Sequence, residues 1–392
     1  MWRNLLLINL FLYTTFILPA QVLEDTTARL NYWFQEANQL IENYQFDAAL
    51  QPLATCYHYA PNNIDYLLKT AYCHQQLGRY RDAKIYYNEV LKQDSIHARA
   101  LSAHANIATR EANYRAAQAY YDQLIKLDST NSYYYKQAAY TALRRNDILP
   151  GIQLFLDAHR LNSSDLEVID QLVDIYIALD DVPSAEQLLR KGLNHDQENI
   201  KLLRNQARIH QKKQEHTGVV NTVNKIMSKG DTADYYQTIL GVAYIKLDSV
   251  DQGIFHLEKI VDRDKADDRI FHYLGLAYFQ KEVYDTSQLY LELAIEAGVS
   301  SKMDAYHGDL AILLDKQKLY RPAIKHYKKA LEYKRTPEYV FQLGHLSDNY
   351  YKDKKIALKL YKEYLATKDK KYRNFTTSRI EQLKEYLHFQ SN

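Results

Sequence analysis

The residues most able to do chemistry, 14 histidines and two cysteines, are scattered along the chain rather than grouped in a motif. Catalytic and nucleotide-binding sites are often recognised by short patterns, because their chemistry fixes the spacing of ligands, nucleophiles and glycines. The sequence contains no GxGxxG, P-loop, HExxH or GxSxG pattern. His74 and His210 fall on the buried side of predicted helices, which favours packed histidines over metal ligands. We therefore predict a protein that is not an enzyme and that holds neither a metal nor a cofactor.

Cys56 and Cys73 are the only two cysteines of the chain. They are too few for a disulfide-rich scaffold or a four-cysteine zinc site. Both fall at a predicted joint between neighbouring helices, so their sulfur atoms could lie close together. Two interpretations stay open: a disulfide, which an oxidising compartment allows, or two small side chains buried as apolar residues.

The composition excludes several classes of protein. There are 11 Gly and 7 Pro among 392 residues, whereas a β-sandwich or barrel needs a turn every few residues. Hydrophobic residues make up 46% of the chain, which is enough for a folded core. The net charge of +2 lacks the basic excess of a general nucleic-acid-binding protein. We expect a folded protein without a nucleic-acid partner.

The first 20 residues differ from the rest of the chain. Arg3 is followed by an uncharged, mostly apolar run from Leu5 to Leu18, and Ala20 ends the segment. This order is typical of a secretory signal peptide, and the run is shorter than the roughly 20 residues of a membrane-spanning helix. We expect cleavage after Ala20, a periplasmic or extracellular location without membrane insertion, and a flexible lead-in over residues 21–29.

A 34-residue repeat fills most of the remaining chain, with copies starting near residues 30, 64, 98, 132, 166, 200, 234, 268, 304 and 338. Positions 8 and 20 carry a small residue in nearly every copy, for example Ala71 and Ala83. Two helices approach closely where both carry small side chains, while larger residues fill the groove around the contact. Position 24 supplies such residues, among them Tyr87, Tyr121 and Phe155. The pattern predicts pairs of antiparallel helices over residues 30–375 and an all-α fold.

The repeat resembles the tetratricopeptide repeat family. The first copy has Trp33, Ala37, Ala49 and Pro61 of the family pattern, and the eighth has Leu274-Gly275, Tyr278 and Tyr284. The resemblance implies a right-handed superhelical solenoid of about ten helix-turn-helix repeats with a concave face. Solenoids need a terminal cap, and we predict one over residues 376–392, with Ser378 and Glu381 forming a capping box at its start.

The concave face of such a solenoid is formed by the first helix of each repeat. In the first four copies this face combines aromatic residues with Arg, Lys and Asn, a composition typical of recognition surfaces. The candidate partner-binding residues are Phe34, Asn38, Tyr72, Arg99, Asn106, Arg110, Tyr133, Lys136, Tyr140 and Arg144. They predict a scaffold or adaptor that binds a partner protein or peptide. The Lys and Asn clamp by which related domains bind chaperone tails is missing.

Two other functions stay open. The array could be a structural spacer within an envelope complex, which a partner covering its convex face would favour. It could instead be a carbohydrate- or lipid-handling accessory protein that uses the Tyr-rich groove. A groove that binds a defined peptide would favour the adaptor.

Several Asp-Ser/Thr tripeptides look like the O-glycosylation acceptor sites of envelope proteins in Bacteroidetes, and would fit a source of that type. They lie at residues 25–27, 94–96, 128–130, 231–233 and 248–250. Asp, Ser and Thr are also preferred at helix caps and turns, so unmodified turns are the favoured interpretation and glycosylation stays the alternative.

Charged residues at equivalent positions of the fifth and sixth copies have opposite signs. Positions 2, 5 and 9 are acidic in the fifth copy and basic in the sixth: Glu167, Asp170 and Asp174, then Lys201, Arg204 and Arg208. First helices of successive repeats pack side by side, so we interpret the two rows as a ladder of ion pairs that fixes the stacking angle. The alternative is a bipolar patch that orients a charged partner.

The ladder predicts a charge-swap effect on the melting temperature. Arg204→Glu and Asp170→Arg should each lower it at low salt, because each places like charges opposite one another. The double variant should recover part of the loss, although exposed pairs contribute only about 0–1 kcal/mol each. Additive losses in the double variant would rule the ladder out.

Overall fold

A computed structural model describes residues 26–263, 265–298 and 301–391. The expected signal peptide, residues 1–20, and residues 21–25 of the expected lead-in lie outside the described residues. Within the described ranges the chain forms helices and short connections, with no strand. The prediction of an all-α fold is confirmed.

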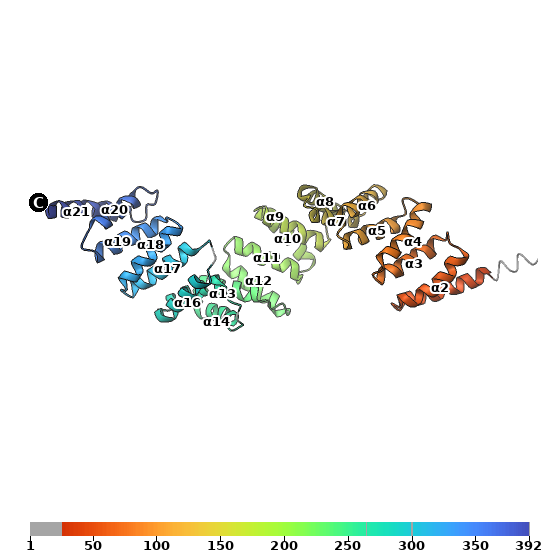
Figure 1. Cartoon of the computed structure of the whole chain (residues 1–392), viewed down its shortest axis with the longest axis horizontal. Coiled ribbons are helices and arrows are strands. Elements are labelled where there is room, and N and C mark those ends of the chain that lie inside the picture. The colour runs from red at the N-terminus through yellow and green to blue at the C-terminus, as the bar shows by residue number, and fades with distance from the viewer. Residues whose placement is uncertain (1–25, 264, 299–300, 392) are drawn as a thin grey trace, which may run out of the picture. The chain divides into compact units, whose positions relative to one another are not determined.

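The chain divides into two compact units, with the boundary between Gln197 and Glu198. The first unit begins with a helix described over residues 26–42. Its further helices are α2 (Phe46–Tyr59), α3 (Ile64–Gln76), α4 (Tyr80–Gln93), α5 (Ala98–Arg110), α6 (Tyr114–Leu127), α7 (Ser132–Arg144), α8 (Ile148–Leu161), α9 (Leu166–Ala178) and α10 (Val182–His195) (Figure 1). Residues 26–29, expected to be a flexible lead-in, are helical, with Thr26 half-buried and residues 27–29 exposed. The Cys56 thiol of α2 lies 3.7 Å from the carbonyl oxygen of Leu30, the next residue of this first helix.

The second unit continues the alternation of helices. Its helices are α11 (Ile200–Lys212), α12 (His216–Ser228), α13 (Asp234–Lys246), α14 (Val250–Val261), α15 (Asp268–Gln280), α16 (Tyr284–Ala297), α17 (Met303–Lys316), α18 (Tyr320–Tyr333), α19 (Pro337–Tyr350), α20 (Lys355–Leu365) and α21 (Arg373–Ser391). Each odd-numbered helix from α3 to α19 packs against the even-numbered helix that follows it. Helix pairs of this kind are the units that the sequence repeat predicts.

The two helices of a pair meet at the small residues of positions 8 and 20. Ala71 and Ala83 of the second copy are completely buried. In the seventh copy both positions are glycine, and a Cβ atom added to Gly253 would stand 2.8 Å from the carbonyl oxygen of Gly241. Since even alanine does not fit there without a shift, the close approach of the helices depends on these residues.

Nine of the turns within helix pairs share one backbone conformation. The residue at position 15 has a positive φ in every copy from the first to the ninth: Tyr44, Gly78, Ala112, Asn146, Asp180, Gln214, Asp248, Glu282 and Lys318. In each turn the next amide closes a hydrogen bond back into the helix, as from Asn113 N–H to the Ala108 carbonyl at 2.8 Å. This is the Schellman arrangement, for which glycine is the usual residue. Only Gly78 adopts it without steric cost.

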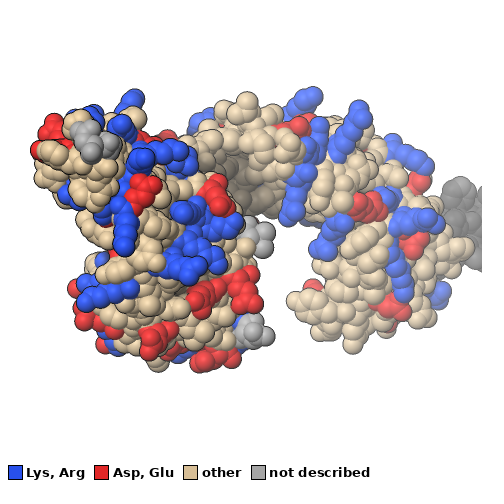
Figure 2. All heavy atoms as spheres, turned by 60° about the vertical axis from the view of Figure 1, so that its left-hand side comes forward, with Lys and Arg blue, Asp and Glu red and all other residues tan. Residues whose placement is uncertain are grey.

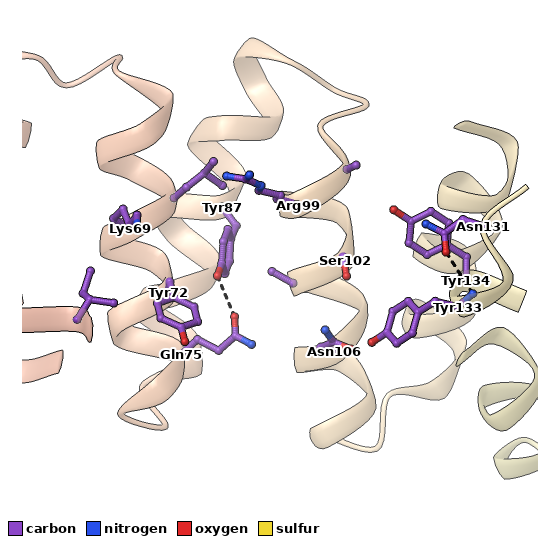
Figure 3. A pocket seen from close by; sticks show the side chains of 14 residues that line it. Lys69, Tyr72, Gln75, Tyr87, Arg99, Ser102, Asn106, Asn131, Tyr133 and Tyr134 are labelled. Carbon is purple, nitrogen blue, oxygen red and sulfur yellow. Dashed lines mark hydrogen bonds between the residues drawn. The ribbon is translucent and has the colours of Figure 1, made fainter. Parts of the chain in front are cut away.

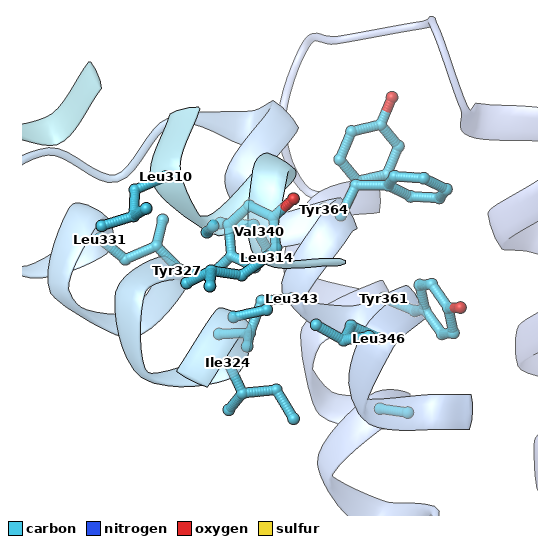
Figure 4. Close-up of a cluster of buried hydrophobic side chains, with 14 of the residues drawn as sticks. Leu310, Leu314, Ile324, Tyr327, Leu331, Val340, Leu343, Leu346, Tyr361 and Tyr364 are labelled. Atoms are coloured by element: carbon cyan, nitrogen blue, oxygen red, sulfur yellow. The ribbon is translucent and has the colours of Figure 1, made fainter. Parts of the chain in front are cut away.

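A hydrophobic cluster forms the core of the second unit near its C-terminal end. Leu310, Leu314, Tyr327, Leu343 and Tyr361 meet there between helices α17 to α20 (Figure 4). Tyr327 and Tyr361 belong to position 24, where the sequence predicts large core residues, and both are almost completely buried. Within the described ranges, eight of the chain's 36 tyrosines are buried core residues.

Helix α21 covers the end of the second unit but begins earlier than predicted. Its first residue is Arg373, so Ser378 lies inside the helix and the predicted capping box is wrong. Burial sets the start, since Thr376 is fully buried and donates its hydroxyl to the Tyr372 carbonyl at 2.8 Å. Asp348 of α19, 3% exposed, anchors the helix by accepting hydrogen bonds from Arg379 Nε at 2.7 Å and Arg379 Nη2 at 3.2 Å.

Loss of this ion pair should release the cap. In the Asp348→Asn variant the buried carboxylate is gone, and breaking a buried pair costs about 3–5 kcal/mol. We expect the lower end of that range, because Arg379 keeps about a third of its side chain in water. Amide hydrogen exchange of α21 should accelerate, while Glu385→Gln on the exposed side of the same helix should leave it unchanged. Equal exchange in both variants would contradict the anchoring role.

Several histidines lie buried or half-buried between helices. Burial is the main cause that lowers the pKa of six of them: His74, His104, His159, His256, His307 and His326. His307 of α17 and His326 of α18 face each other with their Nδ1 atoms 3.0 Å apart. Burial, His326 and Lys329 lower the pKa of His307 to about 4, against the opposing effect of Glu332. In the seventh copy Gln237 takes the place of His307, and its Oε1 lies 2.7 Å from Nδ1 of His256.

These histidines predict acid sensitivity. An unfolded histidine has a pKa near 6.5, so the unfolded chain binds more protons than the folded one between about pH 6.5 and 4. Stability should be complete above pH 6.5 and fall as the pH drops toward 4. His307→Gln reproduces the arrangement seen at Gln237. Between pH 7.5 and 4.5, the free energy of unfolding measured with urea should fall by about 2 kcal/mol less in this variant than in the wild type. His58→Gln, at an exposed position, is the control, and equal losses in both variants would contradict the assignment.

Candidate functional site

A pocket of about 760 Å³ opens on the first unit, and the first helices of successive repeats line it (Figure 3). Helix α3 contributes Leu68, Lys69, Tyr72 and Gln75, helix α5 contributes Ala98, Arg99, Ser102, Ala103 and Asn106, and Tyr133 and Tyr134 come from α7. Ile41, Tyr87 and Asn131 complete the lining. The 34-residue step places equivalent positions side by side, so residues far apart in the sequence share one surface.

Three carboxamide side chains of the pocket are oriented by internal hydrogen bonds. The Tyr87 hydroxyl donates to Gln75 Oε1 at 2.9 Å, and the Tyr121 hydroxyl donates to Asn106 Oδ1 at 2.9 Å. Asn131 Oδ1 accepts from the Tyr133 N–H at 3.2 Å. Since each amide oxygen already has a donor, the amide nitrogens remain to donate hydrogen bonds to a ligand.

The two tyrosines that orient these amides keep their hydroxyl protons. Burial raises the pKa of Tyr87 and of Tyr121 well above the usual value near 10. Both tyrosines occupy position 24, which the sequence analysis assigned to the core. The core residue of a repeat therefore also fixes the hydrogen-bonding direction of a groove residue on the neighbouring helix.

The pocket is basic as well as rich in donors. Lys69 and Arg99 line it toward one end, and Gln75 and Asn106 lie toward the other (Figure 3). No Asp or Glu is among the described residues that line it. Tyr72 and Tyr133 present their rings with exposed fractions of 39% and 42%. The arrangement suits a ligand that offers hydrogen-bond acceptors, negative charge and an apolar group between two rings.

Four of the ten predicted partner-binding residues meet in this pocket: Tyr72, Arg99, Asn106 and Tyr133. Sequence reasoning did not name Lys69, Gln75, Asn131 or Tyr134. Lys69 and Gln75 each lie three residues from Tyr72 on the same helix, so the i, i+3 neighbours of a candidate aromatic would have found them. Asn131 caps α7 from the preceding turn, outside the first-helix positions of the predicted concave face.

Three other candidates make contacts between helices. The ring centroids of Phe34 and Tyr66 are 4.9 Å apart, and those of Tyr140 and Phe155 are 5.1 Å apart. Lys136 lies 2.9 Å from Asp165 and 3.0 Å from Glu167. A binding role for Phe34, Lys136 and Tyr140 stays a prediction.

The remaining candidates lie outside the pocket lining. Asn38 is half-buried in the first helix, while Arg110 and Arg144 are exposed at the last residues of α5 and α7. A binding role for these three residues also stays a prediction.

The charged rows proposed to form a ladder lie in different units, and the ladder stays a prediction. In the first unit, Glu167 pairs with Lys136 and Asp170 is buried. In the second, Arg204 Nη2 lies 2.7 Å from Asp231 Oδ2. An Arg204→Glu variant therefore loses the pair with Asp231 whether or not the ladder exists. Only a recovery of the melting temperature in the double variant would indicate the ladder.

Cys56 and Cys73 are free thiols in the structure, so the disulfide interpretation is wrong for this state. Both are completely buried. Cys73 packs with Ala37, Ala49 and Leu53, and burial raises its pKa to about 11. The two residues act as small apolar side chains of the core, which is the second interpretation of the sequence.

Among the described residues, no three or more His, Cys, Asp or Glu side chains are grouped so that they could hold a metal ion. In the same ranges, no helix combines the length and apolar character needed to cross a membrane.

Comparisons with known proteins give several solved structures and one family model. No curated protein matches the sequence. Among solved structures, PilF of Pseudomonas aeruginosa is 16% identical with a TM-score of 0.46, and the match covers 53% of this chain and 95% of that one. MamA of Desulfovibrio magneticus is 15% identical with a TM-score of 0.41, covering 44% of this chain and 97% of that one.

A third solved structure matches over more of the chain. It is the Cut9–Hcn1 hetero-tetramer of the APC/C, 14% identical with a TM-score of 0.47, covering 88% of this chain and 74% of that one. A family model gives the more specific result. The model described as "Tetratricopeptide repeat" matches residues 64–97 and 98–131, which include α3 to α6 and most of the pocket lining. The chain therefore contains tetratricopeptide repeats, and the two matched repeats supply most of the residues that line the candidate site.

Proposed function

We propose that this protein is a non-catalytic adaptor of the cell envelope that binds an extended segment of a partner protein in the pocket of its first unit. The observation that carries the proposal is the meeting of Tyr72, Arg99, Asn106 and Tyr133, from three different repeats, in one open pocket. An open groove with fixed side chains suits a ligand that lies along several repeats better than a small substrate that must be enclosed.

The chemistry of the lining supports a polypeptide as the ligand. A peptide backbone offers one carbonyl acceptor per residue, and the pocket offers the amide nitrogens of Gln75, Asn106 and Asn131. Lys69 and Arg99 add charged donors for a carboxylate of the partner. Tyr72 and Tyr133 present amphipathic rings, which occur often in the binding centres of protein interfaces.

The envelope location is part of the proposal and follows from the sequence of residues 1–20. The charged start, the apolar run and the small residue Ala20 form the pattern of an export signal. An exported adaptor would meet its partner in the periplasm or outside the cell.

A selection of displayed peptides tests the pocket. Peptides of a random 12-residue library, selected on the wild-type chain, should carry Asp or Glu beside an aromatic or aliphatic residue. Tyr133→Ala should raise the dissociation constant of a selected peptide by about tenfold or more, the cost of truncating a hot-spot residue. Tyr235→Ala is a matched control, because Tyr235 occupies position 2 of its repeat as Tyr133 does, is exposed, and lies in the second unit.

The same measurement discriminates between the candidate functions. Selected peptides that bind Tyr133→Ala as tightly as the wild type would contradict binding in this pocket. A library that yields no binder, together with a partner that covers the convex face, would favour the structural spacer.

A further inference from the structure

The positive charge of the chain is concentrated near its C-terminal end. Residues 316–392 contain 19 Lys and Arg and 8 Asp and Glu, whereas residues 1–315 contain 31 and 40. Helices α18 to α21 all belong to this basic part, within the second unit. A local excess of this size attracts anionic surfaces, although the whole chain is close to neutral.

Two rows of cations lie at equivalent positions of the last two repeats. Relative to the small residue of the second helix, Ala323 in α18 and Ala357 in α20, the cations lie two residues before, two after and five after. The rows are Arg321, Lys325 and Lys328 on α18, and Lys355, Lys359 and Lys362 on α20. All six are exposed, whereas Ala323 and Ala357 are completely buried. Steps of four and three residues separate neighbours in a row by about 6 and 4.5 Å along the helix.

These six cations carry no internal counter-charge. Within the described part of the chain none of them forms an ion pair, whereas other cations of the region do. Lys329 pairs with Glu332 at 2.6 Å and Lys371 with Glu338 at 2.7 Å. The outer face of α18 and α20 therefore presents positive charge that is not neutralised by neighbouring carboxylates.

The same positions carry acidic residues in the two preceding repeats. They are Asp251 and Glu258 on α14, and Asp285 and Glu292 on α16. Figure 2 shows that Lys and Arg side chains gather in patches, with Asp and Glu patches beside them. The outer face of the second unit thus changes sign between α16 and α18, which restricts attraction for an anionic surface to the last two repeats.

We propose that the outer face of α18 and α20 docks the protein on a membrane surface rich in anionic phospholipids. Two rows on neighbouring repeats make a two-dimensional array, which matches a plane of headgroups better than a single linear polyanion. Ile356, 41% exposed, adds an apolar contact beside the α20 row. Each Lys or Arg near an anionic leaflet strengthens binding several-fold.

Vesicle flotation with the full chain tests the proposal. The probe is a phosphatidylcholine vesicle with about 30% phosphatidylglycerol, compared with phosphatidylcholine alone. The triple variant Lys355→Gln, Lys359→Gln, Lys362→Gln should bind the anionic vesicles at least tenfold more weakly than the wild type. About 0.5 M NaCl should abolish the binding of the wild type.

A matched triple variant controls for net charge and for any contribution of the N-terminal apolar run. Arg81→Gln, Arg115→Gln, Arg190→Gln removes three exposed charges from the outer rows of repeats in the first unit. It should bind within twofold of the wild type. Equal loss in both triple variants, or equal binding to neutral and anionic vesicles, would overturn the proposal. The proposal would also be overturned, in favour of nucleic acid, if the triple variant of α20 bound a single-stranded oligonucleotide more weakly than the wild type but bound the anionic vesicles equally well.

Discussion

The close contact of two helices at a pair of small residues is the constraint on which the rest of the structure depends. In each repeat, the side chains at positions 8 and 20 set how near the two helices come, and in the seventh copy only glycine fits. That distance brings position 24 across the pair, so that Tyr87 and Tyr121 reach Gln75 and Asn106. The hydrogen-bonding character of the groove therefore originates in the packing of the core.

The second unit is built from the same repeat and also closes the end of the stack. Its terminal repeats place buried polar groups where the end of the stack needs fixing, as in the contact of Asp348 with Arg379 of the last helix. Exposed positions of these repeats are then available to carry charge without a structural role. The chain thus separates a donor-rich groove, built on the first helices of repeats in one unit, from a basic outer face, built on the second helices of repeats in the other.

The sequence predicted the fold well because each requirement of the repeat is local. Small residues, large core residues and helix lengths recur every 34 residues, and the pattern alone places nearly all helix pairs. Two features at the ends were wrong. Residues 26–29 are helical although residues 27–29 are exposed, and α21 begins at Arg373, where the buried Thr376 bonds back to Tyr372. The cysteines were left open, since their separation depends on how helices meet.

The site was predicted only in part. Position numbers identified Tyr72, Arg99, Asn106 and Tyr133, because the inner face of the array has a fixed phase. The position of a residue within the repeat could not show which amide oxygen already accepts a hydrogen bond, because the donor is a tyrosine hydroxyl on the opposite helix. Nor could it separate Tyr140, whose ring packs on Phe155, from Tyr133, whose ring is exposed.

The turn at position 15, where the backbone φ is positive, has a consequence for how the number of repeats in such an array can change. Its closing hydrogen bond spans only six residues, as from Glu215 N–H to the His210 carbonyl at 2.9 Å. Residues as different as Tyr44, Gln214 and Lys318 adopt the same backbone there. Each helix pair therefore contains its own complete turn, and no particular side chain is needed to form that turn. Whole repeats can be duplicated or deleted as units, and each newly joined hairpin would still turn in the same way.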